Sequence, residues 1–204
     1  MTDAIRIRPA ATLILWRMGV TAAGAHGAQV LMGQRGAQAA FMPSKYVFPG
    51  GAVDAGDQAF GHLSPPCHRS LTLYCPPDAP RPEALVGCGL RELIEEAGLT
   101  LAAAAPLRFV FRAITPAGSS RRFDARFFLA DAGHVLGDTQ DFSRAEDELS
   151  HLHWIAVSES RHLDLPFITE IVLAEVAALL AGHTQPGVPF FDNSGPVPCF
   201  RRLI

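Results

Sequence analysis

Three glutamates, Glu92, Glu95 and Glu96, stand just before Gly98, a residue type that commonly ends a helix. At 100° per residue these carboxylates share one face of a predicted helix, and Leu93 lies on the opposite, apolar face. Glu92 and Glu96 form a like-charged i,i+4 pair, and all three acids occupy the last turn, where the helix dipole disfavours anions. The pattern predicts that a cation is supplied from outside, and clustered oxygen ligands suit Mg²⁺. The simpler alternative is a solvated acidic face.

Length and composition indicate a single globular domain. The chain has 204 residues, of which 49% are hydrophobic, and a mean hydropathy of +0.18, which argues against disorder. The apolar runs are too short to span a membrane and the N-terminus lacks a signal-peptide pattern, so we expect a cytoplasmic protein without a membrane partner. The apolar bias suggests a buried subunit surface and therefore a homodimer.

The net charge of −3 provides no basic field that would attract nucleic acid. A polyanionic small molecule would then depend on local cations. Arg121, Arg122 and Arg126 lie within one short stretch and are the candidate substrate-binding arginines. The alternative is that they keep a strand and a turn soluble.

The cysteines indicate reduced thiols, because they form no CxxC pair and no dense framework. His62, Cys67, His68 and Cys75 follow no common zinc spacing, so we expect them to be loop residues.

Hydrophobic periodicity predicts strands and helices that mix along the chain. Residues 11–18 and 28–34 read as a strand hairpin, later strands are expected at 107–114, 122–130 and 151–157, and helices are expected from Pro82 and over 166–180. The Pro-rich residues 58–82 predict an irregular excursion, and residues 185–204 predict an extended arm packed on the body. This order indicates an α/β or α+β sandwich.

Two glycines, Gly87 and Gly89, interrupt the predicted acidic helix. Each costs about 1 kcal/mol relative to alanine in a helix interior. The close approach of another backbone would explain them.

The segment 91–99, with Phe48-Pro49-Gly50-Gly51 ahead of it, resembles the Nudix box of the Nudix hydrolases. Asp57 stands where that family usually has Glu, and 33 residues (58–90) separate it from Arg91, an insertion within the box. Further segments, 41–43, 46–51, 114–116, 122–128 and 165–169, are similar to the branch that contains peroxisomal coenzyme A diphosphatases with an interrupted box. The resemblance implies one Nudix domain over residues 1–204, folded as an α/β/α sandwich with a mixed sheet and interrupted at about 58–82.

The resemblance also implies the attack of water on a diphosphate, with Mg²⁺ or Mn²⁺ as the cofactor. The implied metal ligands are the Gly50 carbonyl and the carboxylates of Glu92, Glu95 and Glu96. Arg91 would orient Glu95 through an i,i+4 pair. Gly51 belongs to the glycine turn, and Asp57, with its shorter side chain, would orient other groups rather than bind metal.

Glu148 resembles an acid that often precedes the next strand in this family, and it is the candidate general base. The alternative is a solvated loop acid. His151 and His153 share a face of that strand, where we expect a structural role.

These residues predict a hydrolase that cleaves the diphosphate of a nucleoside diphosphate derivative, with coenzyme A or acyl-coenzyme A as the first candidate. ADP-ribose, dinucleotides and nucleotide sugars present the same diphosphate and stay open. The signature that usually accompanies coenzyme A hydrolysis is absent from residues 30–45. A non-catalytic nucleotide sensor would be expected to lose box glutamates, which are all present, and an isomerase would need a Cys-Glu pair that is not evident.

Overall fold

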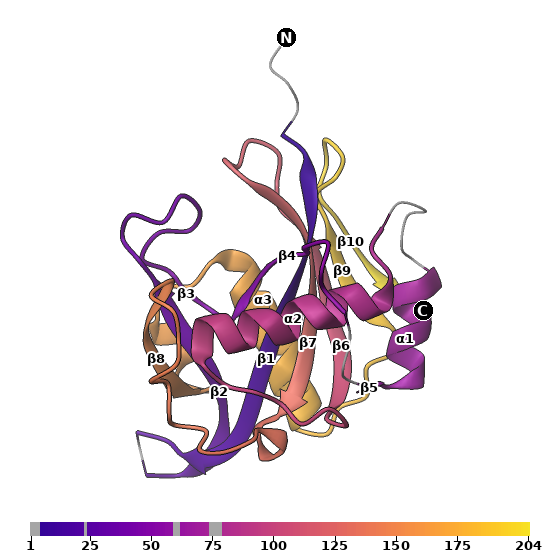
Figure 1. The fold of residues 1–204 in the computed structure, drawn as a ribbon. Coiled ribbons are helices and arrows are strands. Elements are labelled where there is room, and N and C mark those ends of the chain that lie inside the picture. The colour runs from indigo at the N-terminus through magenta and orange to yellow at the C-terminus, as the bar shows by residue number, and fades with distance from the viewer. Residues whose placement is uncertain (1–4, 23, 59–61, 74–78) are drawn as a thin grey trace.

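The computed structural model describes residues 5–22, 24–58, 62–73 and 79–204. Its largest element is a mixed sheet in the spatial order β10-β9-β6-β7-β1-β2-β3 (Figure 1). The central strand β1 (Ile7–Val20) pairs antiparallel with β2 (His26–Arg35) and parallel with β7 (Arg122–Asp131). The predicted hairpin at the start of the chain is therefore confirmed.

The other strands extend this sheet on both sides. β6 (Pro106–Ile114) joins β7 antiparallel and β9 (Val188–Asp192) parallel, and β10 (Cys199–Leu203) forms the edge. β3 (Tyr46–Val47) and β8 (Leu149–Ala156) both pair with β2, while β4 (Gly50–Ala52) pairs with β1. Short 3₁₀ turns lie at Ala132–His134 and Ser160–His162.

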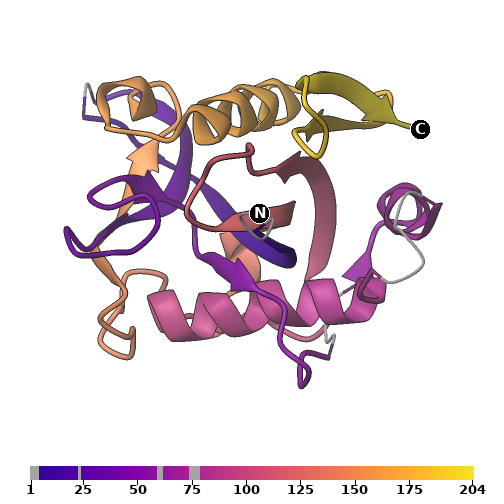
Figure 2. The same ribbon diagram turned by 90° about the horizontal axis from the view of Figure 1, so that it is seen from above.

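Helices cover both faces of the sheet, as Figure 2 shows from above. α2 (Pro82–Ala97) lies on one face and α3 (Phe167–Leu180) lies on the other. Along β1, alternate side chains enter different cores: Leu13 packs in the cluster with α2, and Ile14 packs in the cluster with α3. The predicted α/β/α sandwich with a mixed sheet is confirmed. None of the helices in the described ranges is long and apolar enough to cross a membrane.

The prediction that residues 58–82 are irregular is wrong for the part that the structure describes. β5 (His62–Leu63) pairs with β6, and α1 (Pro65–Leu73) follows it. The double proline suits the first turn of a helix, and Cys67 and Leu71, four residues apart, are buried against the sheet. Part of the insertion therefore belongs to the hydrophobic core.

The C-terminal tail is also more regular than predicted. It packs on the body as an extended segment, as expected, and it is paired as the hairpin of β9 and β10. Phe190, in β9, is buried in the core. The strands form because β6 has a free edge where β9 can pair, which is a tertiary contact that tail composition does not reveal.

The glycines within α2 have different explanations. A Cβ on Gly87 would lie 2.4 Å from the carbonyl oxygen of Gln58, so the predicted close backbone approach is confirmed there. At Gly89 the nearest atom would be the Ala11 Cβ at 3.8 Å, which is an ordinary contact.

Candidate active site

The acidic residues lie where the sequence predicts, on the last two turns of α2. Pro82 occupies the first turn of the helix, and Gly98 ends it in the left-handed conformation (φ 69°), with its N–H donated to the carbonyl of Ile94. No basic residue lies in the last turn. The helix therefore carries its carboxylates at its negative end.

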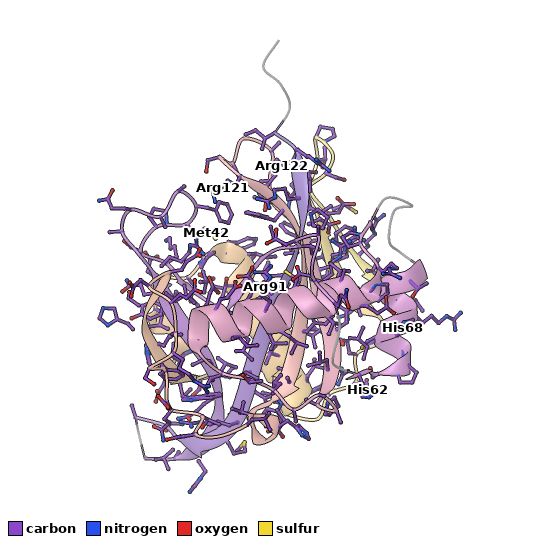
Figure 3. All side chains as sticks on the ribbon, viewed as in Figure 1. Met42, His62, His68, Arg91, Arg121 and Arg122 are labelled. Carbon is purple, nitrogen blue, oxygen red and sulfur yellow. The ribbon has the colours of Figure 1, made fainter. Side chains whose placement is uncertain are left out.

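Arg91 is the cation at the centre of this cluster, and Figure 3 shows it on the helix face that borders β4. Its Nη1 lies 2.8 Å from both Glu92 Oε1 and Glu95 Oε2, so the predicted Arg91–Glu95 pair is present. Its Nε lies 2.8 Å from Asp57 Oδ1, and Nη2 donates to the carbonyl of Ala52. One guanidinium thus ties the acidic helix to the start of the insertion.

Asp57 occupies the position proposed for it, in contact with Arg91 rather than with the glutamates. Burial, the largest single cause, would raise the pKa of Asp57, but the hydrogen bonds from Arg91 and the Asp54 N–H, together with the charge of Arg91, outweigh it and lower that pKa. A carboxylate that holds the orienting arginine is a supporting group for the cluster. Cys88, one turn before Arg91, is buried, and burial raises the pKa of its thiol to about 12.

The glycine turn lies directly against the buried glutamates. Gly50 N–H donates to Glu96 Oε2 at 2.7 Å. A Cβ on Gly51 would lie 2.2 Å from Glu92 Oε1, so only glycine leaves room for this carboxylate. Glu92 and Glu96 are 8% and 2% exposed, which is rare for acids.

Burial has a clear electrostatic effect on both glutamates. Desolvation raises the pKa of Glu96 to about 8, despite the hydrogen bond from Gly50, and the nearby charges of Glu92 and Glu148 add to the increase. Desolvation also raises the pKa of Glu92, partly offset by Arg91. Two acids held in positions that disfavour their charge are well suited to bind a cation.

The described residues hold no preformed cage of three or more His, Cys, Asp or Glu side chains around one point. Glu92 and Glu95 point to Arg91, and Glu96 accepts a hydrogen bond from Gly50. The cluster therefore provides oxygen atoms that can bind a metal ion, but the described side chains do not form a complete coordination shell.

A cavity of about 510 Å³ opens beside this cluster. Its lining includes Gly50, Gly51, Glu92 and Glu148; Glu95 and Glu96 are not among the lining residues. Its apolar and aromatic lining consists of Phe41, Met42, Phe48, Phe123, Phe127, Phe167, Ile168 and Phe191. Each of the five segments that resemble the coenzyme A diphosphatase branch contributes residues to the lining. The acidic helix therefore reaches this apolar cavity through Glu92.

Glu148 lies at the mouth of this cavity, immediately before β8, and is 56% exposed. Its Oε1 accepts a hydrogen bond from Arg35 Nη2 at 2.8 Å. Its charge is among the causes of the raised pKa values of Glu92 and Glu96, and the Glu146 N–H, two residues earlier, donates to the carbonyl of Glu95 at 2.7 Å.

The structure separates the arginines that the sequence groups together. Arg121 is exposed and lines the cavity. Figure 3 shows it on the same side of the molecule as Met42. The prediction for Arg126 is wrong, because its side chain is 1% exposed and contacts Asp124 at 3.0 Å. Arg122 also has a structural role: it donates to the carbonyls of Thr115 and Asn193, and so attaches the β6–β7 turn to the tail.

Within the described residues, the histidines and cysteines that could suggest zinc form no metal site. His62 and His68 belong to β5 and α1 (Figure 3), and Cys67 donates to the Phe109 carbonyl. Cys75 lies outside the described residues. His151 and His153 are exposed on β8.

Sequence reasoning missed Arg35 and the aromatic wall of the cavity. Arg35 ends β2, far from the acidic helix in sequence, and nothing in its neighbours indicates a partner. Phenylalanines occur in four of the five segments that resemble the coenzyme A diphosphatase branch, and this recurrence is a signal for a shared apolar surface.

Solved structures similar to this chain are Nudix hydrolases. A Nudix hydrolase from Alicyclobacillus acidocaldarius is 27% identical, with a TM-score of 0.64 over 85% of this chain and 92% of that chain. A Nudix hydrolase from Nitrosomonas europaea is 13% identical, with a TM-score of 0.55 over 89% and 93% of the two chains. The Nudix domain of Shewanella oneidensis NrtR, in complex with ADP-ribose, is 12% identical, with a TM-score of 0.53 over 86% and 89%. The last two likenesses show the fold alone.

No protein-family model matches the sequence, and neither does any curated protein. The 27% identity and shared fold with the Alicyclobacillus acidocaldarius protein support the Nudix family for this chain and indicate an enzyme of the Nudix hydrolase type.

Proposed function

We propose that the protein is a metal-dependent hydrolase that cleaves the diphosphate linkage of a nucleoside diphosphate derivative. The observation that carries this proposal is the cavity lined by Glu92 at the acidic end of α2, by the glycine turn and by Glu148. A diphosphate is polyanionic, and it can approach carboxylates only if a cation lies between them. The apolar part of the cavity lining leaves room for the rest of the substrate.

The residues present fit a divalent cation such as Mg²⁺ or Mn²⁺. Glu92, Glu95, Glu96 and the Gly50 carbonyl would hold it, because they are hard oxygen ligands and two of them are buried carboxylates with raised pKa values. Mg²⁺ usually keeps several waters and substrate oxygens, so a complete protein cage is unnecessary. When bound, such a cation supplies charge neutralisation at phosphate and a lower pKa for bound water.

The protein's own groups have separate tasks in this proposal. Arg91 orients Glu92 and Glu95, and Asp57 holds Arg91 in place. Glu148 accepts the proton of the attacking water, because it is an exposed carboxylate that lines the same cavity as Glu92.

Coenzyme A or an acyl-coenzyme A is the first candidate substrate. The apolar wall suits a pantetheine or acyl arm, and the segments that form it resemble the coenzyme A diphosphatase branch. Arg121 is the one of the three predicted arginines that lines the cavity, and it would contact a 3′-phosphate. ADP-ribose is the second candidate, because the NrtR Nudix domain was solved with that ligand.

A mass-spectrometric screen tests this function. Coenzyme A, acetyl-coenzyme A, ADP-ribose, a dinucleotide and a nucleotide sugar are each incubated with the protein and Mg²⁺ or Mn²⁺, and parallel samples contain EDTA. We expect metal-dependent cleavage at the diphosphate, fastest for the coenzyme A compounds. Rapid cleavage of ADP-ribose with coenzyme A intact would overturn the substrate assignment, and no cleavage of any compound would overturn the hydrolase assignment.

A further inference from the structure

The strand that follows Glu148 is irregular where it meets β2. The register between β2 and β8 changes by one residue between Met32 and Gln34. Over this interval two residues of β8, His151 and Leu152, oppose Gly33 alone, which is the arrangement of a β-bulge. His151 has a φ of 50°, in the left-handed region that residues other than glycine adopt infrequently.

This bulge determines which residue of β8 lies beside Arg35. Arg35 pairs with Leu149, whereas uninterrupted pairing from the other end of β8 would place Ser150 opposite it. A change of register by one residue moves side chains to the other face of a strand. With the bulge, Leu149 is buried and the preceding Glu148 reaches the Arg35 guanidinium at 2.8 Å.

Arg35 is the more buried residue of its ion pair with Glu148. Its side chain is 15% exposed and lines the cavity. Its Nη2 donates to Glu148, but its buried Nε has no hydrogen-bond acceptor within the part of the chain that the structure describes. A buried donor without an acceptor is unfavourable. We infer that the contact of Nη2 with Glu148 holds the guanidinium in this position. Arg35, Glu148 and Glu92 line the same cavity, and the Glu146 N–H donates to the carbonyl of Glu95 at 2.7 Å, which places the pair beside the acidic end of α2.

We propose that Arg35 is a positioning residue that holds Glu148 over the acidic end of α2, in a register set by the β-bulge at His151. The inference rests on the proposed function, in which Glu148 takes the proton from water. Arg35 acts through Glu148 and does not itself bind the substrate phosphate. The guanidinium carries its N–H groups in a fixed planar fork, and one of them donates to a single oxygen of Glu148, whereas the donors of a lysine ammonium rotate freely.

A double-mutant cycle tests this role with Arg35→Gln, Glu148→Gln and the combined variant. Steady-state rates are measured with Mg²⁺ on the compound that the wild type cleaves fastest. We expect Arg35→Gln to lower kcat on the order of tenfold to a hundredfold, with KM changed by less than about threefold. In the Glu148→Gln background the same change should have almost no further effect, because the carboxylate to be oriented is already lost. Arg35→Lys should recover part of kcat.

Arg8 provides a matched control, because it is an exposed arginine that lines the same cavity. The effect of Arg8→Gln should be the same with and without Glu148→Gln. If the effect of Arg35→Gln persists in full in the Glu148→Gln background, Arg35 contacts the substrate directly and the positioning role is overturned. If Arg35→Gln raises KM and leaves kcat unchanged, Arg35 likewise contacts the substrate directly and the positioning role is overturned.

Measurements that do not depend on turnover complete the test. Arg35→Gln should retain Mn²⁺ binding by calorimetry within about threefold and a cooperative thermal transition. Loss of Mn²⁺ binding would overturn the proposal, because Arg35 would then act on the glutamates of α2. A wild type without diphosphatase activity overturns the proposed function together with this inference, whereas an active wild type with independent effects overturns the inference alone.

Discussion

Replacement of Glu96 by glutamine removes one charge from the acidic cluster and leaves its shape nearly unchanged. Glu96 is buried and accepts the Gly50 N–H, and the glutamine carbonyl can accept the same hydrogen bond. The effect of Glu96→Gln on the metal-free protein should therefore be electrostatic. It should also depend on pH.

The magnitude follows from the pKa of Glu96. Its carboxyl keeps a proton up to about pH 8 in the folded protein, against an ordinary value of 4.5. Between these values the folded state binds more protons than the unfolded chain, so the free energy of unfolding falls as the pH rises. At about 1.4 kcal/mol for each pKa unit, the whole loss is on the order of 5 kcal/mol as an upper limit. The stabilising contribution is complete below about pH 4.5 and is lost once the pH exceeds about 8.

Urea denaturation in EDTA at several pH values between about 5 and 9 measures this effect. Glu96→Gln should match the wild type near pH 5 and exceed it by several kcal/mol near pH 9, because glutamine does not ionise. With Mg²⁺ present at high pH, the wild type should regain stability and the variant should regain less. A wild-type stability that does not change relative to the variant across this range would refute the electrostatic account of the cluster.

Three further predictions concern other parts of the site. Gly51→Ala should lower turnover about a hundredfold, because the new Cβ would lie 2.2 Å from a Glu92 oxygen and displace this carboxylate; kinetics with Mg²⁺ check it. Arg122→Ala should lower the free energy of unfolding by about 1–3 kcal/mol, because two hydrogen bonds to backbone carbonyls are lost. Arg121→Ala should leave the thermal midpoint unchanged, and it should raise KM more for coenzyme A than for its 3′-dephospho form. His151→Val should be less stable than His151→Gly by about 1–2 kcal/mol in urea denaturation, because the φ of 50° suits glycine and strains a β-branched residue.

The acidic helix could be predicted from sequence because its information is local. Amphipathic spacing, Pro82 at the start and Gly98 at the end place Glu92 and Glu96 on one face. The Arg91–Glu95 pair follows from the same i,i+4 geometry. The burial of the two glutamates depends on the contact between α2 and the glycine turn, which residue spacing does not indicate.

Other features depend on strand pairing and could not be read from spacing. Arg122 and Arg126 alternate with phenylalanines in the sequence. This pattern fits arginines that face the substrate, but it fits equally the observed structural roles, in which Arg126 pairs with Asp124 and Arg122 donates to the Asn193 carbonyl. The contact of Arg35 with Glu148 requires a bulge in β8, and a one-residue irregularity leaves no clear mark in the hydrophobic pattern. The helix α1 in the insertion was obscured by its prolines, although they fall in its first turn.

Product masses from a reaction in oxygen-18 water test metal-dependent diphosphate hydrolysis most directly. Wild-type protein and the Glu96→Gln variant are each incubated with coenzyme A and with ADP-ribose, in Mg²⁺ or in EDTA. We expect the wild type with Mg²⁺ to cleave at the diphosphate and place one labelled oxygen on one of the two phosphate products, and we expect turnover to fall at least about a hundredfold in the variant. Undiminished cleavage in EDTA, or a variant as active as the wild type, would contradict the assignment of the chemistry to the acidic end of α2.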